Sequence, residues 1–591
     1  MLCKINILLF CKAQLQIIGV DMTDKNKEHR NFMGALPWFL PLPDTDPFGA
    51  GSTFQSYVSS LGMRPWIPFQ KSVSTSFKQG RAALKMLRSK ENATEILQQD
   101  GRFASEEWSS KLRYALPAMS YIYWKQMMME LVEEAPNIDE QTKRKAKFFT
   151  EQFVDMVSPS NNPLMNPEVI KEAKESKGKS LLKGAQNFAK AVQQRKIIPK
   201  HSEEGFFEVG RNVATTKGSV VARNHLCEII QYEPTTETVQ KIPVLVIAAW
   251  INKYYILDMG EKKSFLKYLV DNGFQVFAIS WKNPTADMRD TSFGDYIVHG
   301  ALFAREIIED ITGEASPAAI GYCIGGTLLA TAQAYAKAQN IPAFSSLTFF
   351  TTMVDFCAVG DVQLFIDERS IQFIEEKMNQ KGYLDGSEMG STFAFLRSRD
   401  LLWNYFVQNY FMGKEPTPFD ILAWNEDSTR MPATMHSWYL RNLYLYNNLI
   451  VPGKLDINGT PLDLTRITED IYMVGAEADH IAPAETVYKI HSYTRSQIRY
   501  VLCSGGHNTG IVNPAVRNKG YHYVSQGIQA PDHSSLDTWK ENATKQEGSF
   551  WKDLVPWLQE RCGETIEAPQ TLGSSQNPII ESAPGTYVLE T

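Results

Sequence analysis

The segment Gly321-Tyr322-Cys323-Ile324-Gly325-Gly326 places a cysteine among glycines at a point where the chain changes character. The apolar run Ala318 to Ile320 before it predicts a strand, and the alanine- and leucine-rich run Thr327 to Lys337 after it predicts a helix. Glycines permit a tight turn between the two, which presents the sulfur at the helix N-terminus. Because the helix dipole and free N–H groups favour thiolate there, the segment predicts a nucleophilic cysteine.

Two further residues follow the cysteine in the order that a catalytic triad on such a turn requires. Asp479 comes soon after the apolar run Ile471 to Val474, and His507 follows the strand-like run Ile498 to Leu502. The order nucleophile, acid, histidine is that of the α/β-hydrolase fold. In this interpretation His507 accepts the thiol proton, and Asp479 orients the imidazole and stabilises its charged form.

Each of these residues also has a simpler interpretation. A cysteine between glycines can be a small buried hydrophobe. Asp479 can cap a loop, and His507 can be a loop histidine with its hydrogen bonds satisfied. His480, next to Asp479, competes with it for a role in the site. The agreement of strand, helix and partner order favours the triad.

Composition limits the class of protein. A chain of 591 residues is long enough for two domains or one large decorated domain. A hydrophobic fraction of 43% and a net charge of −6 are typical of a soluble globular protein and give no indication of a nucleic-acid partner. The 7 cysteines are widely spread and show no zinc-type spacing, which predicts a reducing cytoplasm and no metal.

The first part of the chain, residues 1–70, is predicted to be an irregular arm. Its longest clean apolar run, Ile7 to Cys11, is too short to span a bilayer, and no small-residue cleavage site follows it. The segment Met22-Thr23-Asp24-Lys25 resembles a natural beginning, so we expect Met22 as an alternative start. Prolines and tryptophans between Asn31 and Phe69 disfavour regular helix. We therefore expect no membrane span here.

Residues 71–200 are predicted to form a helical domain. Apolar residues recur at spacings of three and four from Trp108 to Met127, with Pro117 expected to kink or split the helix. The apolar stripe predicts packing within this domain or on the catalytic core. Alternatively, the aromatic and methionine-rich stretch Tyr121 to Met129 contacts an apolar surface outside the protein. A lysine-rich link, Lys171 to Lys200, ends the region.

Residues 201–565 are predicted to form the catalytic domain. Strand-like runs at Cys227 to Tyr232, Val244 to Ala248 and Gln275 to Ile279 alternate with helical segments such as Lys262 to Asn272. This alternation predicts a largely parallel sheet covered on both faces. An aromatic-rich insertion, about residues 350–461, is predicted to be a cap over the site, and residues 566–591 a loose tail. The predicted fold is thus an α/β-hydrolase domain with a cap, preceded by a mainly helical N-terminal domain.

Longer motifs closely resemble those of polyhydroxyalkanoate synthases. The resemblance runs from about Asp100 almost to the C-terminus. Ala248-Ala249 departs from an expected Pro-Pro, and the first 21 residues match nothing. The motifs include Phe207-Glu208-Val209-Gly210-Arg211-Asn212, Trp250-Ile251-Asn252-Lys253-Tyr254-Tyr255, Ser280-Trp281-Lys282-Asn283-Pro284, the cysteine segment itself, Trp403-Asn404-Tyr405, Trp438-Tyr439-Leu440-Arg441-Asn442 and Ser504-Gly505-Gly506-His507.

The resemblance implies a class I poly(3-hydroxyalkanoate) polymerase. Such enzymes polymerise short-chain (R)-3-hydroxyacyl-CoA, such as 3-hydroxybutyryl-CoA, and release CoA through a cysteine-bound acyl intermediate. They work as homodimers without an obligatory second subunit, in the cytoplasm at polymer granules, where granule-associated proteins are further partners. The resemblance implies no cofactor, because coenzyme A is the leaving group of the substrate.

The site is predicted in more detail from the same motifs. The backbone N–H groups of Ile324 and Ile251 are the expected oxyanion donors. Trp424 and Trp250 are further candidates for substrate binding. Arginines are expected to bind the phosphates of coenzyme A, with ordinary salt bridges as the alternative; the candidates are Arg397, Arg399, Arg430 and Arg441.

Several functional questions stay open at this point. His507 is favoured as the base in both half-reactions, but Asp479 could instead activate the incoming hydroxyl. Two other kinds of protein fit the same residues. One is a hydrolase, either a thioesterase or a polyester depolymerase, and the other is a non-catalytic protein that coats granules.

Overall fold

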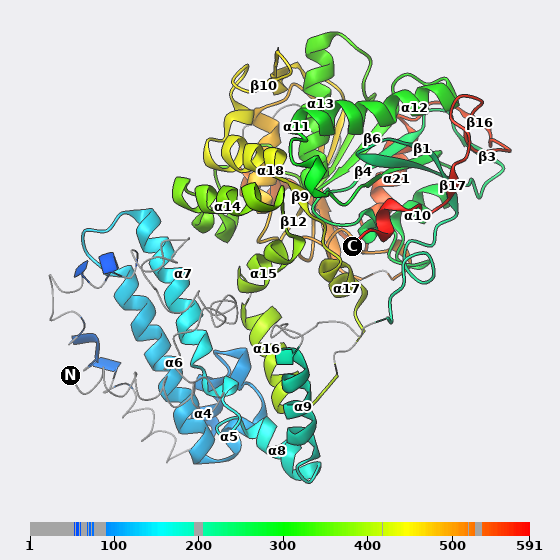
Figure 1. Cartoon of the computed structure of the whole chain (residues 1–591). Coiled ribbons are helices and arrows are strands. Elements are labelled where there is room, and N and C mark those ends of the chain that lie inside the picture. The colour runs from blue at the N-terminus through cyan, green and yellow to red at the C-terminus, as the bar shows by residue number, and fades with distance from the viewer. Residues whose placement is uncertain are drawn as a thin grey trace.

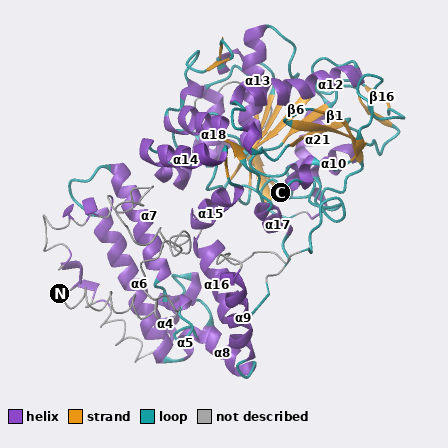
Figure 2. Ribbon diagram, viewed as in Figure 1, coloured by secondary structure: helices purple, strands orange, loops and turns teal. Residues whose placement is uncertain are grey.

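The computed structural model describes residues 90–193, 205–396, 398–415, 418–517, 519–525 and 535–591, together with scattered residues between 53 and 78. Most of the predicted arm and Arg397 therefore lie outside the described residues. A helical N-terminal part stands beside an α/β part, and a group of cap helices lies between them (Figure 1). Strands gather in the α/β part (Figure 2).

An eleven-stranded sheet forms the centre of the α/β part, in the order β15-β14-β13-β12-β7-β6-β4-β5-β2-β1-β17. The six middle strands are parallel and the strands at both edges are antiparallel. The parallel strands are β4 (Val244–Ile247), β5 (Val276–Trp281), β6 (Ala318–Tyr322), β7 (Leu347–Phe350), β12 (Ile471–Ala476) and β13 (Ile498–Cys503). The edge strands are β1 (Gly218–Arg223), β2 (Cys227–Tyr232), β14 (Tyr521–Val524), β15 (Thr544–Glu547) and β17 (Glu581–Ser582).

Both faces of this sheet are covered, which explains the continuous apolar runs of its strands. Along β4, Leu245 and Ile247 belong to one hydrophobic core, whereas Val244 and Val246 belong to a second core on the opposite face. The covering helices are α10 (Phe265–Asp271), α12 (Phe303–Thr312), α13 (Ile324–Gln339) and α21 (Trp551–Gln559). The strands and the α/β-hydrolase fold predicted from the sequence are therefore confirmed.

A helical insertion occupies the chain between β7 and β12, where the sequence predicts a cap. Its helical elements are α-helices and π-helical segments. They are α14 (Glu368–Lys381), α15 (Gly386–Leu396), η9 (Ser398–Trp403), α16 (Asn404–Phe406), η10 (Val407–Phe411), α17 (Asp420–Glu426), α18 (Ala433–Tyr439) and η11 (Leu440–Leu445).

The N-terminal part is built from α4 (Lys90–Leu97), α5 (Glu106–Ser110), α6 (Leu112–Glu133), α7 (Glu140–Met156), α8 (Pro167–Glu175) and α9 (Lys179–Gln193). The helical pattern breaks at Lys111, before α6, while Pro117 lies inside α6. The lysine-rich segment is not a simple link, because α9 packs against η10. In Figure 1, α9 lies beside α16, the helix that precedes η10. A Cβ added at Gly184 of α9 would lie 2.1 Å from the Tyr410 carbonyl oxygen.

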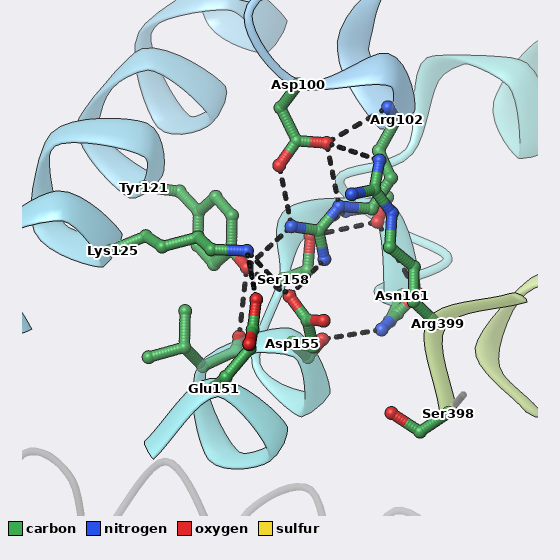
Figure 3. A network of polar contacts seen from close by, with 12 residues as sticks. Asp100, Arg102, Tyr121, Lys125, Glu151, Asp155, Ser158, Asn161, Ser398 and Arg399 are labelled. Atoms are coloured by element: carbon green, nitrogen blue, oxygen red, sulfur yellow. Dashed lines mark hydrogen bonds and ion pairs between the residues drawn. The ribbon is translucent and has the colours of Figure 1, made fainter. Parts of the chain in front are cut away.

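Contacts from the N-terminal helices reach several parts of the cap. Arg399 of η9, whose side chain is 42% exposed, donates to Asp100 at 3.0 Å. Asp100 belongs to a largely buried network with Arg102 and Asp155 (Figure 3). Ser398 hydrogen-bonds Gln152. Phe148 of α7 packs edge-on against Phe365 and Phe395. The helical part thus holds the cap through both polar and apolar contacts.

The prediction of a loose tail over residues 566–591 is wrong. Strand β16 (Thr565–Glu567) pairs with β3 (Thr238–Gln240), and β17 pairs with the edge strand β1. Val588, near the C-terminus, is only 2% exposed. The segment looks loose by composition, but the strand edges of β1 and β3 offer backbone hydrogen-bonding groups that an extended chain satisfies.

Candidate active site

The predicted turn at Cys323 is present and strained. Cys323 follows β6 and is the N-cap residue of α13, with φ 56° and ψ −126°, a conformation that side chains rarely adopt. The glycines serve a different purpose from the one expected, since the positive φ belongs to the cysteine itself. A Cβ at Gly321 would lie 2.4 Å from Gly326 Cα, and a Cβ at Gly326 would lie 2.0 Å from Thr352 Oγ1. These glycines therefore let the end of β6 and the start of α13 approach each other and Thr352 closely.

The structure brings the three predicted triad residues together at the carboxyl ends of their strands. His507 Nδ1 lies 2.7 Å from Asp479 Oδ2, and the imidazole also hydrogen-bonds the Cys323 side chain. The side chains of Asp479 and His507 are 0% and 7% exposed. Burial lowers the pKa of His507, but the charges and hydrogen bonds of Asp479 and Cys323 outweigh burial and raise it well above the ordinary value.

Two cap tyrosines lie close to the thiol. Tyr439 at the end of α18 and Tyr444 in η11 both interact electrostatically with Cys323, and their hydroxyl oxygens are 3.3 Å apart. Burial raises the pKa of both tyrosines above the ordinary value, to about 12 for Tyr444. The sequence does not mark either tyrosine as a site residue, because their spacing is also that of ordinary core aromatics.

The expected oxyanion donors occupy suitable elements. Ile324 is the first residue of α13, a position whose N–H has no partner within its own helix. Ile251 lies in the loop after β4, and a Cβ at Gly325 would lie 2.4 Å from Ile247 O at the end of that strand. Thr429 Oγ1 donates to Trp250 O at 2.6 Å, and the Thr429 N–H donates to Ile251 O at 3.2 Å. The cap thereby holds the loop carbonyls.

The two tryptophans predicted to bind substrate are enclosed by protein. Trp250 is 1% exposed and packs against Phe293, Tyr296 and Tyr439. Trp424 is 5% exposed and donates from Nε1 to Lys253 O at 2.7 Å. These contacts favour a supporting role for both indoles over direct contact with substrate.

Three of the arginines considered for coenzyme A phosphates already have partners in the chain, and the fourth, Arg397, lies outside the described residues. Arg399 pairs with Asp100 at 3.0 Å. Arg441 makes a two-point contact with Glu375 at 2.7 and 2.8 Å and a further one with Glu368. Arg430 donates to Thr591 O at 2.9 Å. The contacts of Arg399 and Arg441 favour the alternative of ordinary salt bridges.

Within the described part of the chain, no group of three or more His, Cys, Asp or Glu side chains is placed to hold a metal ion. The helices of that same part include none that is long and apolar enough to cross a membrane.

A strained cysteine turn at the end of a parallel strand, with an aspartate and a histidine at the ends of two further strands, places this chain among α/β-hydrolase-fold proteins. Residues 242–514 match the family model described as "alpha/beta hydrolase fold". Residues 99–269 match the model described as "Poly-beta-hydroxybutyrate polymerase (PhaC) N-terminus".

Curated relatives identify the family. The chain is 40% identical over 491 residues to the poly(3-hydroxyalkanoate) polymerase of Methylorubrum extorquens, covering 83% of this chain and 80% of the relative. It is 38% identical over 494 residues to the poly(3-hydroxyalkanoate) polymerase subunit PhaC of Cupriavidus necator, covering 83% of each. The chain belongs to the poly(3-hydroxyalkanoate) polymerase family.

The solved structures that the chain matches are more distant. A monoacylglycerol lipase from Paleococcus ferrophilus is 11% identical, with a TM-score of 0.30 over 57% of this chain and 99% of the lipase. An epoxide hydrolase from Bacillus megaterium is 15% identical, with a TM-score of 0.30 over 50% of this chain and 93% of the hydrolase.

Proposed function

We propose that this chain is a class I acyltransferase that polymerises short-chain (R)-3-hydroxyacyl-CoA, such as 3-hydroxybutyryl-CoA, into polyester. Cys323, His507 and Asp479 are its catalytic residues. The observation that carries this proposal is the continuous contact from the Cys323 thiol through His507 to Asp479, with the acid 2.7 Å from the imidazole. Membership of the polymerase family supports the substrate class.

The first half-reaction is a thioester exchange. His507 accepts the thiol proton while Cys323 Sγ attacks the carbonyl carbon of the acyl-CoA. The bond between that carbon and the CoA sulfur breaks, and CoA leaves as a thiol with the proton from the imidazolium. Backbone N–H groups of Ile324 and Ile251 stabilise the oxyanion that forms between these steps.

The second half-reaction forms the ester bond. The 3-hydroxyl of a second monomer or of the growing chain gives its proton to His507 and attacks the enzyme thioester. The acyl–sulfur bond breaks, and the proton returns to Cys323. A cysteine suits this sequence because a thioester keeps the acyl group activated, whereas a serine would form a more stable oxyester.

The cap has a chemical purpose in this scheme, because water would end chains by hydrolysis. Tyr439 and Tyr444 lie near the thiol, and the helical part of the chain braces the cap that carries them. The scheme requires no cofactor or metal, since CoA is only the leaving group. A homodimer at the surface of a cytoplasmic polymer granule, together with granule-associated proteins, completes the proposal.

The test is to incubate the purified protein with 3-hydroxybutyryl-CoA while following thiol release and turbidity. Release of CoA together with clouding supports polymerisation. Release without clouding would indicate a hydrolase, and neither signal would indicate a granule-coating protein. Cys323→Ala should abolish both signals, whereas Cys357→Ala, which removes an exposed thiol, should retain them.

The intermediate offers a second readout. Labelled substrate should acylate Cys323, and mass spectrometry of a digest should locate the adduct there. Label on any other residue would contradict the proposed chemistry.

A further inference from the structure

A buried lysine lies two residues after the proposed oxyanion donor Ile251. Lys253 is 3% exposed, and its Nζ donates to Val588 O at 2.9 Å and to Glu590 O. Both acceptors are backbone carbonyls of the last four residues, 588–591, which we call the C-terminal strap. The end of the chain thus contacts the loop that carries an expected oxyanion donor.

The strap is held at further points. The Glu590 carboxylate accepts the Asn283 N–H at 3.0 Å, and Thr591 O accepts Arg430 Nη2 at 2.9 Å. Just before the strap, the Tyr587 N–H donates to the buried Glu228 at 3.1 Å. These contacts fix the strap against the cap and against the loop after β5, so its carbonyls are set in position.

Lys253 is equally well fixed on its own side. Its carbonyl accepts Trp424 Nε1 at 2.7 Å. Burial lowers the pKa of Lys253, while the nearby charges of Asp427 and Glu590 oppose this effect. A buried ammonium is stable only when its N–H groups have acceptors. Removal of the strap carbonyls would therefore leave the Lys253 ammonium without these two acceptors, and its side chain would shift and displace the loop that carries it.

From these contacts we infer that Lys253 is a positioning residue that, held by the C-terminal strap, keeps the Trp250–Ile251 loop in place for oxyanion stabilisation at Cys323. This inference rests on the proposed function. It assigns to the last residues of the chain a part in catalysis although they lie more than 250 residues from the cysteine in sequence. Loss of the Lys253 ammonium or of the C-terminal strap should affect the chemical step more than substrate binding.

The test compares the full-length protein, Lys253→Met, a deletion of residues 588–591, and the two changes combined. Loss of one oxyanion donor typically lowers kcat about 10²- to 10³-fold, so displacement of the loop should lower kcat about 10- to 100-fold. KM should change by no more than about threefold, because binding is not the affected step. The kcat of the combined variant should be no lower than that of the more damaging single variant, since both changes remove the same coupling.

Matched controls are available in the same chain. Lys171→Met removes an exposed lysine of the helical part, and Ile579→Ala truncates a side chain that is 53% exposed ahead of the strap. Both should keep kcat within about twofold of the parent. Thermal unfolding of every variant shows that folded protein is compared.

Two results would overturn the inference. One is a kcat of Lys253→Met within about twofold of the parent, whether or not KM rises, and the other is that the effects of the two changes multiply in the combined variant. If the deletion of residues 588–591 prevents folding, Lys253→Met alone tests the inference. Methionine fills much of the volume of the lysine side chain but carries no charge. Absence of CoA release by the parent protein would instead overturn the proposed function.

Discussion

His507 Nδ1 lies 2.7 Å from Asp479 Oδ2, while Asp479 Oδ1 accepts the N–H groups of Ile481 and Ala482 at 2.8 and 2.9 Å. One carboxylate oxygen thus orients the imidazole and the other fixes the loop that carries the acid. The base is therefore aimed at Cys323 by a rigid partner.

Asp479→Asn should lower the rate of CoA release about 10³-fold, because the amide can hold the wrong tautomer of His507 and cannot stabilise its charged form. Stopped-flow measurement of thiol release checks this. The control Asp463→Asn changes an aspartate that accepts the Thr465 N–H at a short helix in another loop and should change the rate less than about twofold. A rate within threefold of the parent in Asp479→Asn would contradict the role of the acid.

Gly326→Ala should abolish CoA release and reduce the yield of folded protein. The added Cβ would lie 2.0 Å from Thr352 Oγ1, 2.7 Å from Thr352 Cγ2 and 2.8 Å from Thr352 Cβ. Because Cβ is fixed to the backbone, rotation of the Thr352 side chain cannot relieve this contact. Gly390→Ala is the matched control, because nothing lies within 4 Å of a Cβ there and the residue is inside α15. That variant should be as stable as the parent or about 0.5 kcal/mol more stable in thermal unfolding.

Asp100→Asn should destabilise the helical part of the chain by about 2 to 4 kcal/mol, since it leaves Arg102 buried with fewer partners. Arg102 contacts Asp100 at 2.7 Å and Asp155 at 2.8 Å (Figure 3). Burial raises the pKa of Asp100, but Arg102 outweighs burial and lowers it to about 2. Because this pKa is lowered on folding, the stabilisation is present above about pH 4 and is lost as the pH falls toward 2.

Urea unfolding followed by tryptophan fluorescence measures this effect. Glu106→Gln, a change at an exposed residue of α5, should alter stability by less than about 0.5 kcal/mol. Equal stabilities of Asp100→Asn and the parent at pH 7 would show that the network does not hold the domain.

His436 makes stability depend on pH within the cap. Burial lowers the pKa of His436 to about 4, and the side chain is 2% exposed beside Tyr439. Its pKa falls on folding, so the unfolded chain binds the proton more tightly and stability decreases as the pH falls from about 6.5 toward 4. His436→Leu should remove this loss, which amounts to about 2 kcal/mol between pH 7.5 and 5.

Urea titrations of the parent and of His436→Leu at pH 7.5 and at pH 5 test the prediction. The quantity compared is the difference in free energy of unfolding between the two proteins, which should change by about 2 kcal/mol between these pH values. His225→Leu, which replaces an exposed histidine, should leave the pH dependence as it is in the parent. A parallel decline of the parent and His436→Leu would contradict the assignment.

The sequence by itself determined the class of protein, because local patterns carry that information. A strand, a glycine-flanked cysteine and a helix are consecutive, so the local pattern alone assigns Cys323 to the turn. Asp479 and His507 could be placed because each comes a few residues after an apolar run that forms a buried parallel strand. The contact of 2.7 Å between them is a consequence of the neighbouring positions of β12 and β13 in the sheet.

Only the tertiary structure decided which residues surround this triad. Lys253 meets Val588 and Glu590 across more than 330 residues, and no local pattern reports a contact of that range. Residues 566–591 look loose by composition, yet strand edges and a buried ammonium supply partners for their backbone. Arg399 and Arg441 look like phosphate ligands until their carboxylate partners are seen. Long-range polar contacts depend on how elements pack, and packing is a property of the whole chain.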